Sequence, residues 1–143
     1  MANYLNFSCC KDAKKVWEGM LVNKSFSYEA IIPSPKTKEK CDKFFFVSPD
    51  DHITLEANRP WFNWYKWQME NWGVKWDALN PARMGDQIVF CSPWNKPCDK
   101  LFQGIANKFG VEFSSYHRYE DGECITEDWK PTKKQSVKIL RVE

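Results

Sequence analysis

The spacing of apolar residues near the start of the chain predicts a strand followed by a helix. Residues 3–9 alternate between apolar and polar side chains, a pattern that is typical of a strand with one buried face. Asp12 follows at a position where it would cap a helix. The apolar residues of this helix recur at intervals of three and four positions and are Ala13, Val16, Trp17, Met20 and Leu21. Residues 28–32 then predict a second strand, which ends at Pro33.

The middle of the chain is rich first in charged and then in aromatic residues. Six of the eight residues 36–43 are charged, which predicts a solvated loop. The apolar run 44–47 fits an extra strand or a buried loop anchor equally well, since periodicity does not separate the two in so short a run. Asn58 and Pro60 suit a helix cap and a first helical turn, so we expect a helix there that ends at Gly73.

The second half of the chain predicts further strands with a helix between the first two. The strands are expected at residues 87–91 and 111–119. The helix is expected at residues 96–109, where leucine, phenylalanine and isoleucine form an apolar stripe, and Gly110 ends it. Residues 136–142 are expected to add a last strand.

The order of these elements predicts an α+β fold. Two β-α-β units are separated by a Trp-rich helical insertion over residues 58–80, and the chain ends in a basic tail over residues 129–143. This order suits the ferredoxin-like plan, in which a split βαβ arrangement forms one sheet with the helices on one face. The 143 residues and their 43% hydrophobic content are sufficient for a single domain that spans residues 1–143.

Charge, cysteines and hydropathy narrow the class of protein further. A net charge of +2 is compatible with a nucleic-acid partner but does not require one. The six cysteines contain no CxxC pair and no histidine stands at zinc-finger spacing, so we expect free thiols and no bound metal or other cofactor. No stretch approaches the ~18 apolar residues that cross a bilayer, so we expect a soluble cytoplasmic protein with no membrane partner.

Several short segments resemble one family. They are Ile31-Ile32-Pro33-Ser34-Pro35, Trp64-Tyr65, Asn71-Trp72-Gly73-Val74-Lys75-Trp76-Asp77 and Val89-Phe90-Cys91-Ser92-Pro93-Trp94. These segments are similar to motifs of the YubB-like domains, a ferredoxin-like family of unknown function found in bacteriophage and plasmid proteins. The likeness spans most of residues 3–120, and the run from Asn71 to Asp77 is its specific part. The resemblance implies a ferredoxin-like fold and a phage or mobile-element setting, with no reaction attached.

The Trp-rich run within this resemblance has two interpretations. As a binding platform, Trp72 and Trp76 would stack on a base, a sugar or a peptide. As a structural motif, Gly73 would end the helix so that both indoles fold beneath the sheet, with Lys75 and Asp77 fixing the turn. We favour the structural interpretation.

Two other features are candidate partner-binding sites. On a helical wheel Trp67 points away from the face that the other aromatic residues share, so we expect it on the surface. Five acidic residues crowd a loop of nine positions and are Glu120, Asp121, Glu123, Glu127 and Asp128. Such a loop would offer carboxylates, in place of phosphates, to a basic nucleic-acid-binding groove on another protein.

No catalytic residue is predicted. The histidines His52 and His117 have no carboxylate or cysteine at ligand spacing, and the sequence has no nucleophile elbow or phosphate-binding glycine loop. We therefore expect a non-enzymatic protein that binds a host protein or nucleoprotein complex and inhibits a bacterial defence system, as an anti-CRISPR protein does. One alternative is a nucleic-acid-binding module that uses exposed aromatic residues and the lysines of residues 36–43 and 130–141. The other is a small hydrolase or transferase.

Overall fold

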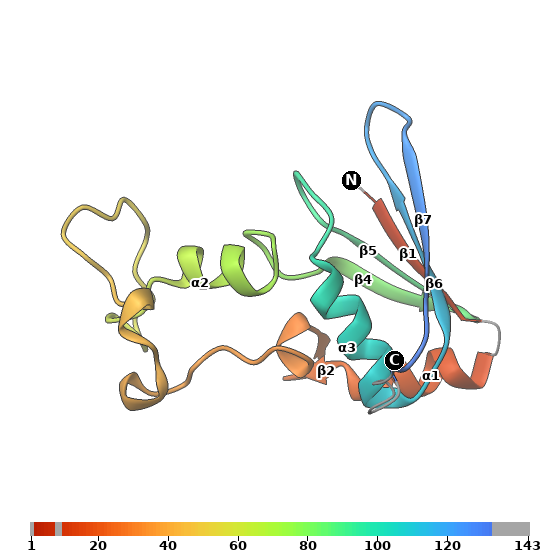
Figure 1. The fold of residues 1–143 in the computed structure, drawn as a ribbon, viewed down its shortest axis with the longest axis horizontal. Helices are drawn as coiled ribbons and strands as arrows, with labels where there is room; N and C mark the ends of the chain where they lie inside the picture. Colours follow the sequence, from red (N-terminus) through yellow and green to blue (C-terminus); the bar gives the residue numbers. More distant parts are fainter. Residues whose placement is uncertain (1, 8–9, 133–143) are drawn as a thin grey trace, which may run out of the picture.

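The computed structural model describes residues 2–7 and 10–132 and has the α+β class that the sequence predicts (Figure 1). Five antiparallel strands form one sheet in the order β4-β5-β1-β6-β7. The strands are β1 (Ala2–Phe7), β4 (Leu79–Met84), β5 (Gln87–Cys91), β6 (Phe113–Arg118) and β7 (Cys124–Trp129). The helices are α1 (Cys10–Gly19), α2 (Trp64–Asn71) and α3 (Asp99–Phe109).

One face of the sheet packs against α1 and α3 to form the core. Alternate residues of the strands point into it, so that Leu5, Ile88 and Phe113 are buried while Tyr4 and Tyr116 on the other face are half-buried. The buried residues of the two helices are Ala13, Val16, Met20, Leu101, Phe102, Ile105 and Ala106. Helix α3 ends at Gly110, as the sequence predicts. Gly110 has a left-handed backbone conformation that turns the chain towards β6.

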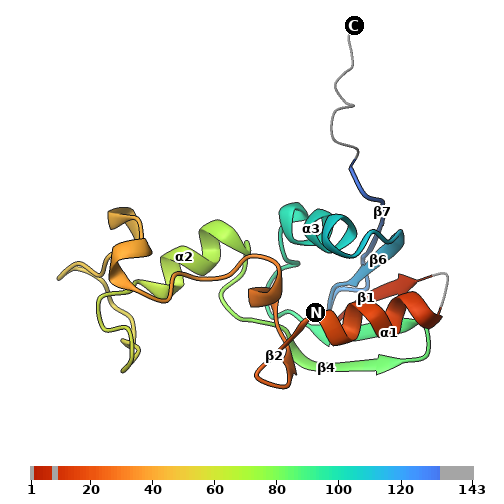
Figure 2. The same cartoon turned by 90° about the horizontal axis from the view of Figure 1, so that it is seen from below.

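The segment that contains α2 extends from the sheet as an arm, which we define as residues 36–71 (Figures 1 and 2). It contains two short 3₁₀ helices, η2 (Lys38–Lys40) and η3 (Lys43–Phe45). A single antiparallel bridge joins Phe46 to Phe62, and the Asn63 N–H donates a hydrogen bond to the Phe45 carbonyl at 2.8 Å. The apolar run 44–47 is therefore not a strand of the sheet. It anchors the loop through the half-buried Phe45 and Phe46, whereas Phe44 is 53% exposed, so the run is not a fully buried anchor.

Residues 28–32 do not form the predicted strand. They follow the hairpin of β2 (Leu21–Val22) and β3 (Ser25–Phe26) and begin with the 3₁₀ helix η1 (Tyr28–Ala30). The hydroxyl of Ser27 accepts a hydrogen bond from the Glu29 N–H at 3.1 Å, and Asp77 accepts one from the Tyr28 N–H at 2.8 Å. These two bonds cap the start of a helical turn, and Asp77 is too distant in sequence for local alternation to reveal it.

Three helix starts also differ from the sequence prediction. Helix α3 begins at Asp99 and not at residue 96, and the starts of α2 and α1 differ as well. The side chain of Asn63 accepts a hydrogen bond from the Lys66 N–H at 3.0 Å, so α2 begins at Trp64 and Asn58 lies outside it. Asp12 lies inside the first turn of α1 instead of capping it. For α2 and α1, a polar residue near the true start of the helix was wrongly predicted to be its cap.

Both edge strands of the sheet were missed from the sequence. Pro81 within β4 argues against a strand, but an edge strand tolerates proline because one side of its backbone is unpaired. In β7 the half-buried residues alternate with exposed ones and include Glu127, which hides the apolar alternation. The strand predicted at residues 136–142 lies outside the described residues.

Candidate partner-binding groove

Trp72 lies in the core where α2 ends. Its side chain is 1% exposed, and its Nε1 donates a hydrogen bond to the carbonyl of Ile32 at 3.0 Å. The indole packs edge-on against the rings of Tyr28 and Trp67, with centroid separations of 5.5 and 5.4 Å. Trp72 therefore fixes the end of the arm to the segment that follows the β2-β3 hairpin.

Gly73 and Asp77 tie the rest of the Trp-rich run to the domain. Gly73 has a φ of 78°, and a Cβ at this position would lie 3.1 Å from the backbone nitrogen of Cys98. The carboxylate of Asp77 accepts hydrogen bonds from the Ser27 hydroxyl and the Tyr28 N–H. Burial raises the pKa of the Asp77 carboxyl, and its hydrogen bonds act in the opposite direction. The run is thus held from both ends.

Two tryptophans lie where the sequence did not place them. Trp76 is 37% exposed and does not fold beneath the sheet. The Nζ of Lys75 lies 4.7 Å from the Trp76 ring centroid, and no ion pair joins Lys75 to Asp77 within residues 2–7 and 10–132. The prediction that Trp67 is a surface residue is wrong, because its side chain is 6% exposed and its ring packs against that of Phe62.

Trp76 forms part of a groove at one end of the sheet. The groove has a volume of about 740 Å³ and lies where the start of β4, the end of β5 and the β6-β7 turn come together. Its lining residues are Trp76, Leu79, Cys91, Pro93, Trp94, Tyr119, Glu120 and Asp121. The groove therefore combines apolar and aromatic side chains with two carboxylates.

Trp94 is the most exposed of the large hydrophobic side chains that the structure describes, at 85%. Its φ is 75°, and the Asn95 N–H donates a hydrogen bond to the Pro93 carbonyl at 2.9 Å, so Trp94 is the central residue of a γ-turn. The buried hydroxyl of Ser92 donates to the Asn95 carbonyl at 2.6 Å and holds this turn closed. Such turns are strained, and strained residues cluster at binding sites. The local structure thus presents an indole to solvent at an energetic cost.

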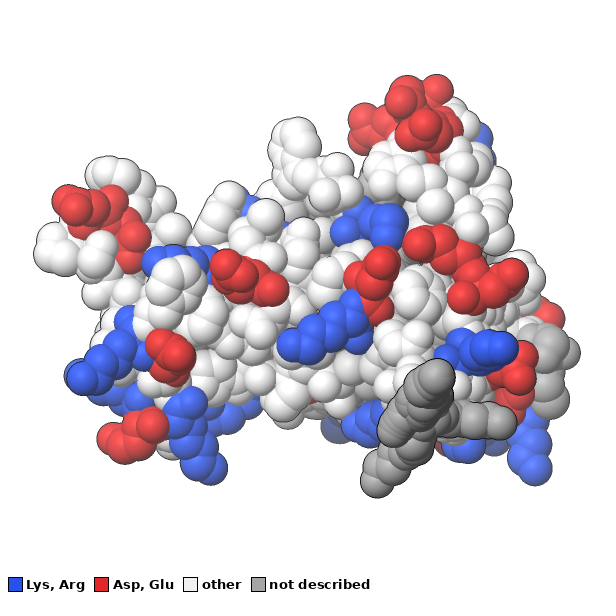
Figure 3. Space-filling model, in the orientation of Figure 1, with Lys and Arg blue, Asp and Glu red and all other residues white. Residues whose placement is uncertain are grey.

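The acidic residues do not form the single loop that the sequence predicted. Three of them lie in the β6-β7 turn at the end of the hairpin and are Glu120, Asp121 and Glu123 (Figure 3). The other two lie on β7, where Glu127 accepts a hydrogen bond from Lys96 at 3.2 Å and Asp128 accepts one from Ser114 at 2.6 Å. Of the five acidic residues, Glu120 and Asp121 line the groove.

His117 belongs to a polar network inside the core. Its side chain is fully buried, with Nδ1 hydrogen-bonded to Asn3 and Nε2 3.2 Å from the hydroxyl oxygen of Ser115. That hydroxyl also accepts a hydrogen bond from the Trp129 indole at 2.9 Å. Burial lowers the pKa of His117 to about 4, so its imidazole is neutral at pH 7. The other histidine, His52, is exposed on the arm.

Cysteines and carboxylates provide no further site in the described part of the chain. Four cysteines are free thiols and are Cys41, Cys91, Cys98 and Cys124. Among the residues that the structure describes, no three His, Cys, Asp or Glu side chains gather in a way that could hold a metal ion. Over the same residues, no helix has both the length and the apolar character needed to cross a membrane.

Comparisons of the chain with protein-family models, with curated proteins and with solved structures found no match. The groove is therefore interpreted from its own geometry. Sequence reasoning did not single out Trp94 as a site residue, although a tryptophan next to Pro93 in a turn between two elements is an available signal. Tyr119 carries no such signal, because only the fold brings it beside the groove.

Proposed function

We propose that the protein is a non-enzymatic interaction protein that binds a macromolecular partner through the groove between Trp94 and the acidic β6-β7 turn. The observation that carries this proposal is the exposure of Trp94, at 85%, in a strained γ-turn. An indole that is 85% exposed contributes little to the stability of the free domain, whereas a partner that covers it gains a large apolar contact.

The expected contribution of Trp94 to binding is substantial. Burial of a tryptophan side chain removes about 150–250 Å² from water, which is worth about 4–6 kcal/mol at 25 cal/mol per Å². Ordering and desolvation costs reduce the net gain, and tryptophan hot spots at interfaces lose about 2–4 kcal/mol on truncation. The carboxylates of Glu120 and Asp121 beside the groove favour a partner surface with positive charge.

We further propose that the scaffold is a ferredoxin-like domain from a phage or mobile element. The β2-β3 hairpin and the arm form an insertion between α1 and β4, and β7 is an added edge strand. The remaining chain order β1-α1-β4-β5-α3-β6 and the neighbouring strands β4-β5-β1-β6 support this plan. The resemblance to YubB-like domains supports the setting. The proposed partner is then a host protein or nucleoprotein complex in the bacterial cytoplasm, such as a CRISPR effector that the protein inhibits by occupying it.

A capture experiment with matched variants tests the binding site. Tagged wild-type protein, Trp94→Ala and Phe44→Ala are incubated with bacterial lysate, and the captured proteins are quantified by mass spectrometry. Phe44 is the control because it is an aromatic residue of the arm, 53% exposed, that lies away from the groove. We expect a partner that Phe44→Ala retains and Trp94→Ala loses. Equal recovery with all three proteins contradicts the proposed site.

Inhibition by occupancy has its own test. Full inhibition should require about one molecule of the protein per target molecule. Reversal of Glu120, Asp121 and Glu123 to lysine should slow association without unfolding the domain. Added salt should have a similar effect, since exposed charges are screened over about 10 Å at 0.1 M ionic strength. Inactivation of many target molecules by one molecule of the protein would instead indicate catalysis.

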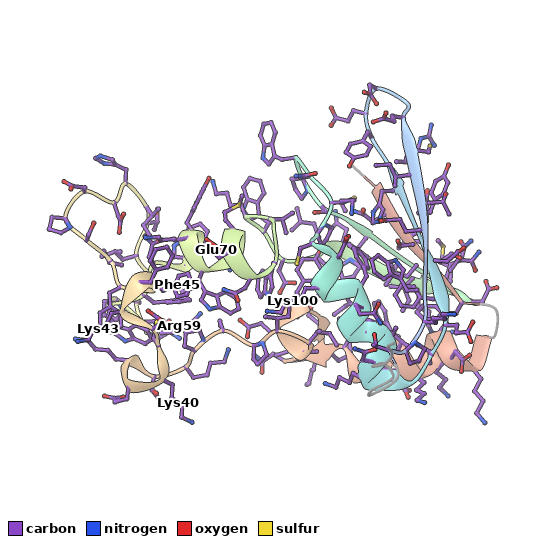
Figure 4. All side chains as sticks on the ribbon, in the orientation of Figure 1. Lys40, Lys43, Phe45, Arg59, Glu70 and Lys100 are labelled. Carbon is purple, nitrogen blue, oxygen red and sulfur yellow. The ribbon has the colours of Figure 1, made fainter. Side chains whose placement is uncertain are left out.

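A second candidate function is nucleic-acid binding by the arm. Lys40 and Lys43 project from the arm into solvent (Figure 4), and the Nζ of Lys66 lies 3.7 Å from the ring centroid of the exposed Phe44. Lysines interleaved with an exposed aromatic ring suit the phosphates and bases of a single strand. Binding of oligonucleotides that weakens steeply with salt and is lost in Phe44→Ala, but not in Trp94→Ala, would support this function.

A further inference from the structure

We propose that the groove receives the side chain of an arginine from a basic segment of the partner protein. This inference rests on the proposed function and adds the chemical group that is bound. The groove has aromatic side chains from Trp76, Trp94 and Tyr119 and carboxylates from Glu120 and Asp121. An arginine has a planar cation that matches both kinds of lining group.

The aromatic lining suits a planar cation. The face of an indole attracts positive charge, and a guanidinium group also stacks on it. Trp76 shows this behaviour within the chain, since the Nζ of Lys75 lies 4.7 Å from its ring centroid. Among the described residues no cation lies over the ring of Trp94, which is 85% exposed. The face of Trp94 is therefore open to a cation from a partner.

The acidic lining supplies the opposite charge. Glu120 and Asp121 are exposed, and neither forms an ion pair within the residues that the structure describes. Glu123 in the same turn extends the negative surface (Figure 3). A carboxylate accepts two parallel hydrogen bonds from a guanidinium group, which the ammonium group of lysine does not provide. The combination of stacking and paired hydrogen bonds favours arginine over lysine.

The same features indicate a protein segment and not a nucleic acid. The phosphates that flank a stacked base would lie against Glu120 and Asp121, and like charges repel. The volume of about 740 Å³ falls within the range of about 300–1,000 Å³ that is typical of ligand sites. A long side chain with backbone on either side fits such a volume.

A titration with small peptides tests the inference. Isotope-labelled full-length protein is titrated with N-acetyl-Gly-Arg-Gly-amide, and the indole N–H signals of Trp76 and Trp94 are followed by NMR. We expect both signals to shift at millimolar peptide and to shift less as salt is added. The peptide with citrulline in place of arginine keeps the shape and loses the charge, so it should bind about tenfold more weakly.

A charge variant separates the acidic lining from the aromatic one. The double variant that combines Glu120→Gln and Asp121→Asn should bind the arginine peptide about tenfold more weakly. Its affinity for the citrulline peptide should be unchanged. Trp94→Gly should abolish the shift at Trp76 for both peptides. Glycine is chosen because it adopts the φ of 75° without strain, so the turn is preserved while the ring is removed.

Three results would overturn the inference. They are the absence of binding by the arginine peptide, equal binding of the two peptides, and a stronger shift of the Trp94 signal with a short oligothymidylate. These results are distinguishable from failure of the proposed function. If Trp94→Gly loses the captured partner although the arginine peptide does not bind, the groove is the binding site and arginine is not its ligand. If Trp94→Gly captures the partner normally, the proposed function itself fails.

Discussion

Replacement of Trp72 by alanine should severely destabilise the domain. The side chain is 1% exposed, and its ring packs edge-on against Tyr28 and Trp67. Removal of a buried tryptophan side chain costs about 3–5 kcal/mol, because the surrounding groups only partly fill the cavity. The carbonyl of Ile32 also loses the hydrogen bond from Nε1, which adds about 1 kcal/mol. The total of about 4–6 kcal/mol is a large part of the stability of a domain, which is about 5–15 kcal/mol.

Urea unfolding followed by circular dichroism measures this loss. Trp72→Phe keeps an aromatic ring but removes the Nε1 donor, so it should lose about 2 kcal/mol of unfolding free energy. Trp94→Ala is the surface control and should change the free energy by less than about 0.5 kcal/mol, since its ring is 85% exposed. Unfolding of Trp72→Ala and Trp94→Ala at the same urea concentration would contradict a stabilising role for the buried Trp72 ring.

Three further predictions concern stability. Gly73→Ala should lose about 2 kcal/mol of unfolding free energy in urea, because its φ is 78° and the new Cβ would lie 3.1 Å from Cys98. A variant as stable as the wild type would contradict this close approach. Trp94→Gly should be about 1 kcal/mol more stable than Trp94→Ala, since only glycine adopts a φ of 75° freely, and equal stability would argue against backbone strain. Burial disfavours the protonated form of His117 and lowers its pKa from 6.5 to about 4. The stabilising contribution of the neutral side chain to the free energy of unfolding is therefore complete above pH 6.5 and is lost as the pH falls towards 4. Urea unfolding at several pH values measures this loss. Between pH 6.5 and 4 the free energy of unfolding should fall by up to about 3 kcal/mol more for the wild type than for His117→Gln.

The three central strands β1, β5 and β6 and the two core helices could be predicted because their apolar periodicity matches their burial, whereas the edge strands β4 and β7 lack this pattern. Leu5 and Phe7 on β1 are buried and flank the exposed Asn6, and the apolar stripe of α3 faces the sheet. The arm helix α2 was harder because tryptophan and tyrosine occur around its circumference. The helical wheel therefore selected the wrong face. Tyr65, on the face that the other aromatic residues share, is 40% exposed, whereas Trp67 is buried and packs against Phe62.

Contacts between distant segments explain most of the other differences. Asp77 caps the turn at Tyr28, which no pattern within residues 28–32 indicates. The groove is assembled from Trp76, Trp94 and the β6-β7 turn, and these lie side by side only after the sheet has formed. Composition gave the acidic turn and the excess of tryptophan, but it did not indicate which tryptophan would be exposed.

The most direct test of the binding groove is the dissociation constant of the complex with the captured partner, measured by calorimetry for wild-type protein and Trp94→Gly. In the wild-type titration one molecule of the protein should bind each site on the partner. The affinity of Trp94→Gly should be at least about 30-fold weaker, which corresponds to a hot spot of about 2 kcal/mol. An unchanged dissociation constant in a folded Trp94→Gly variant would contradict binding through the groove.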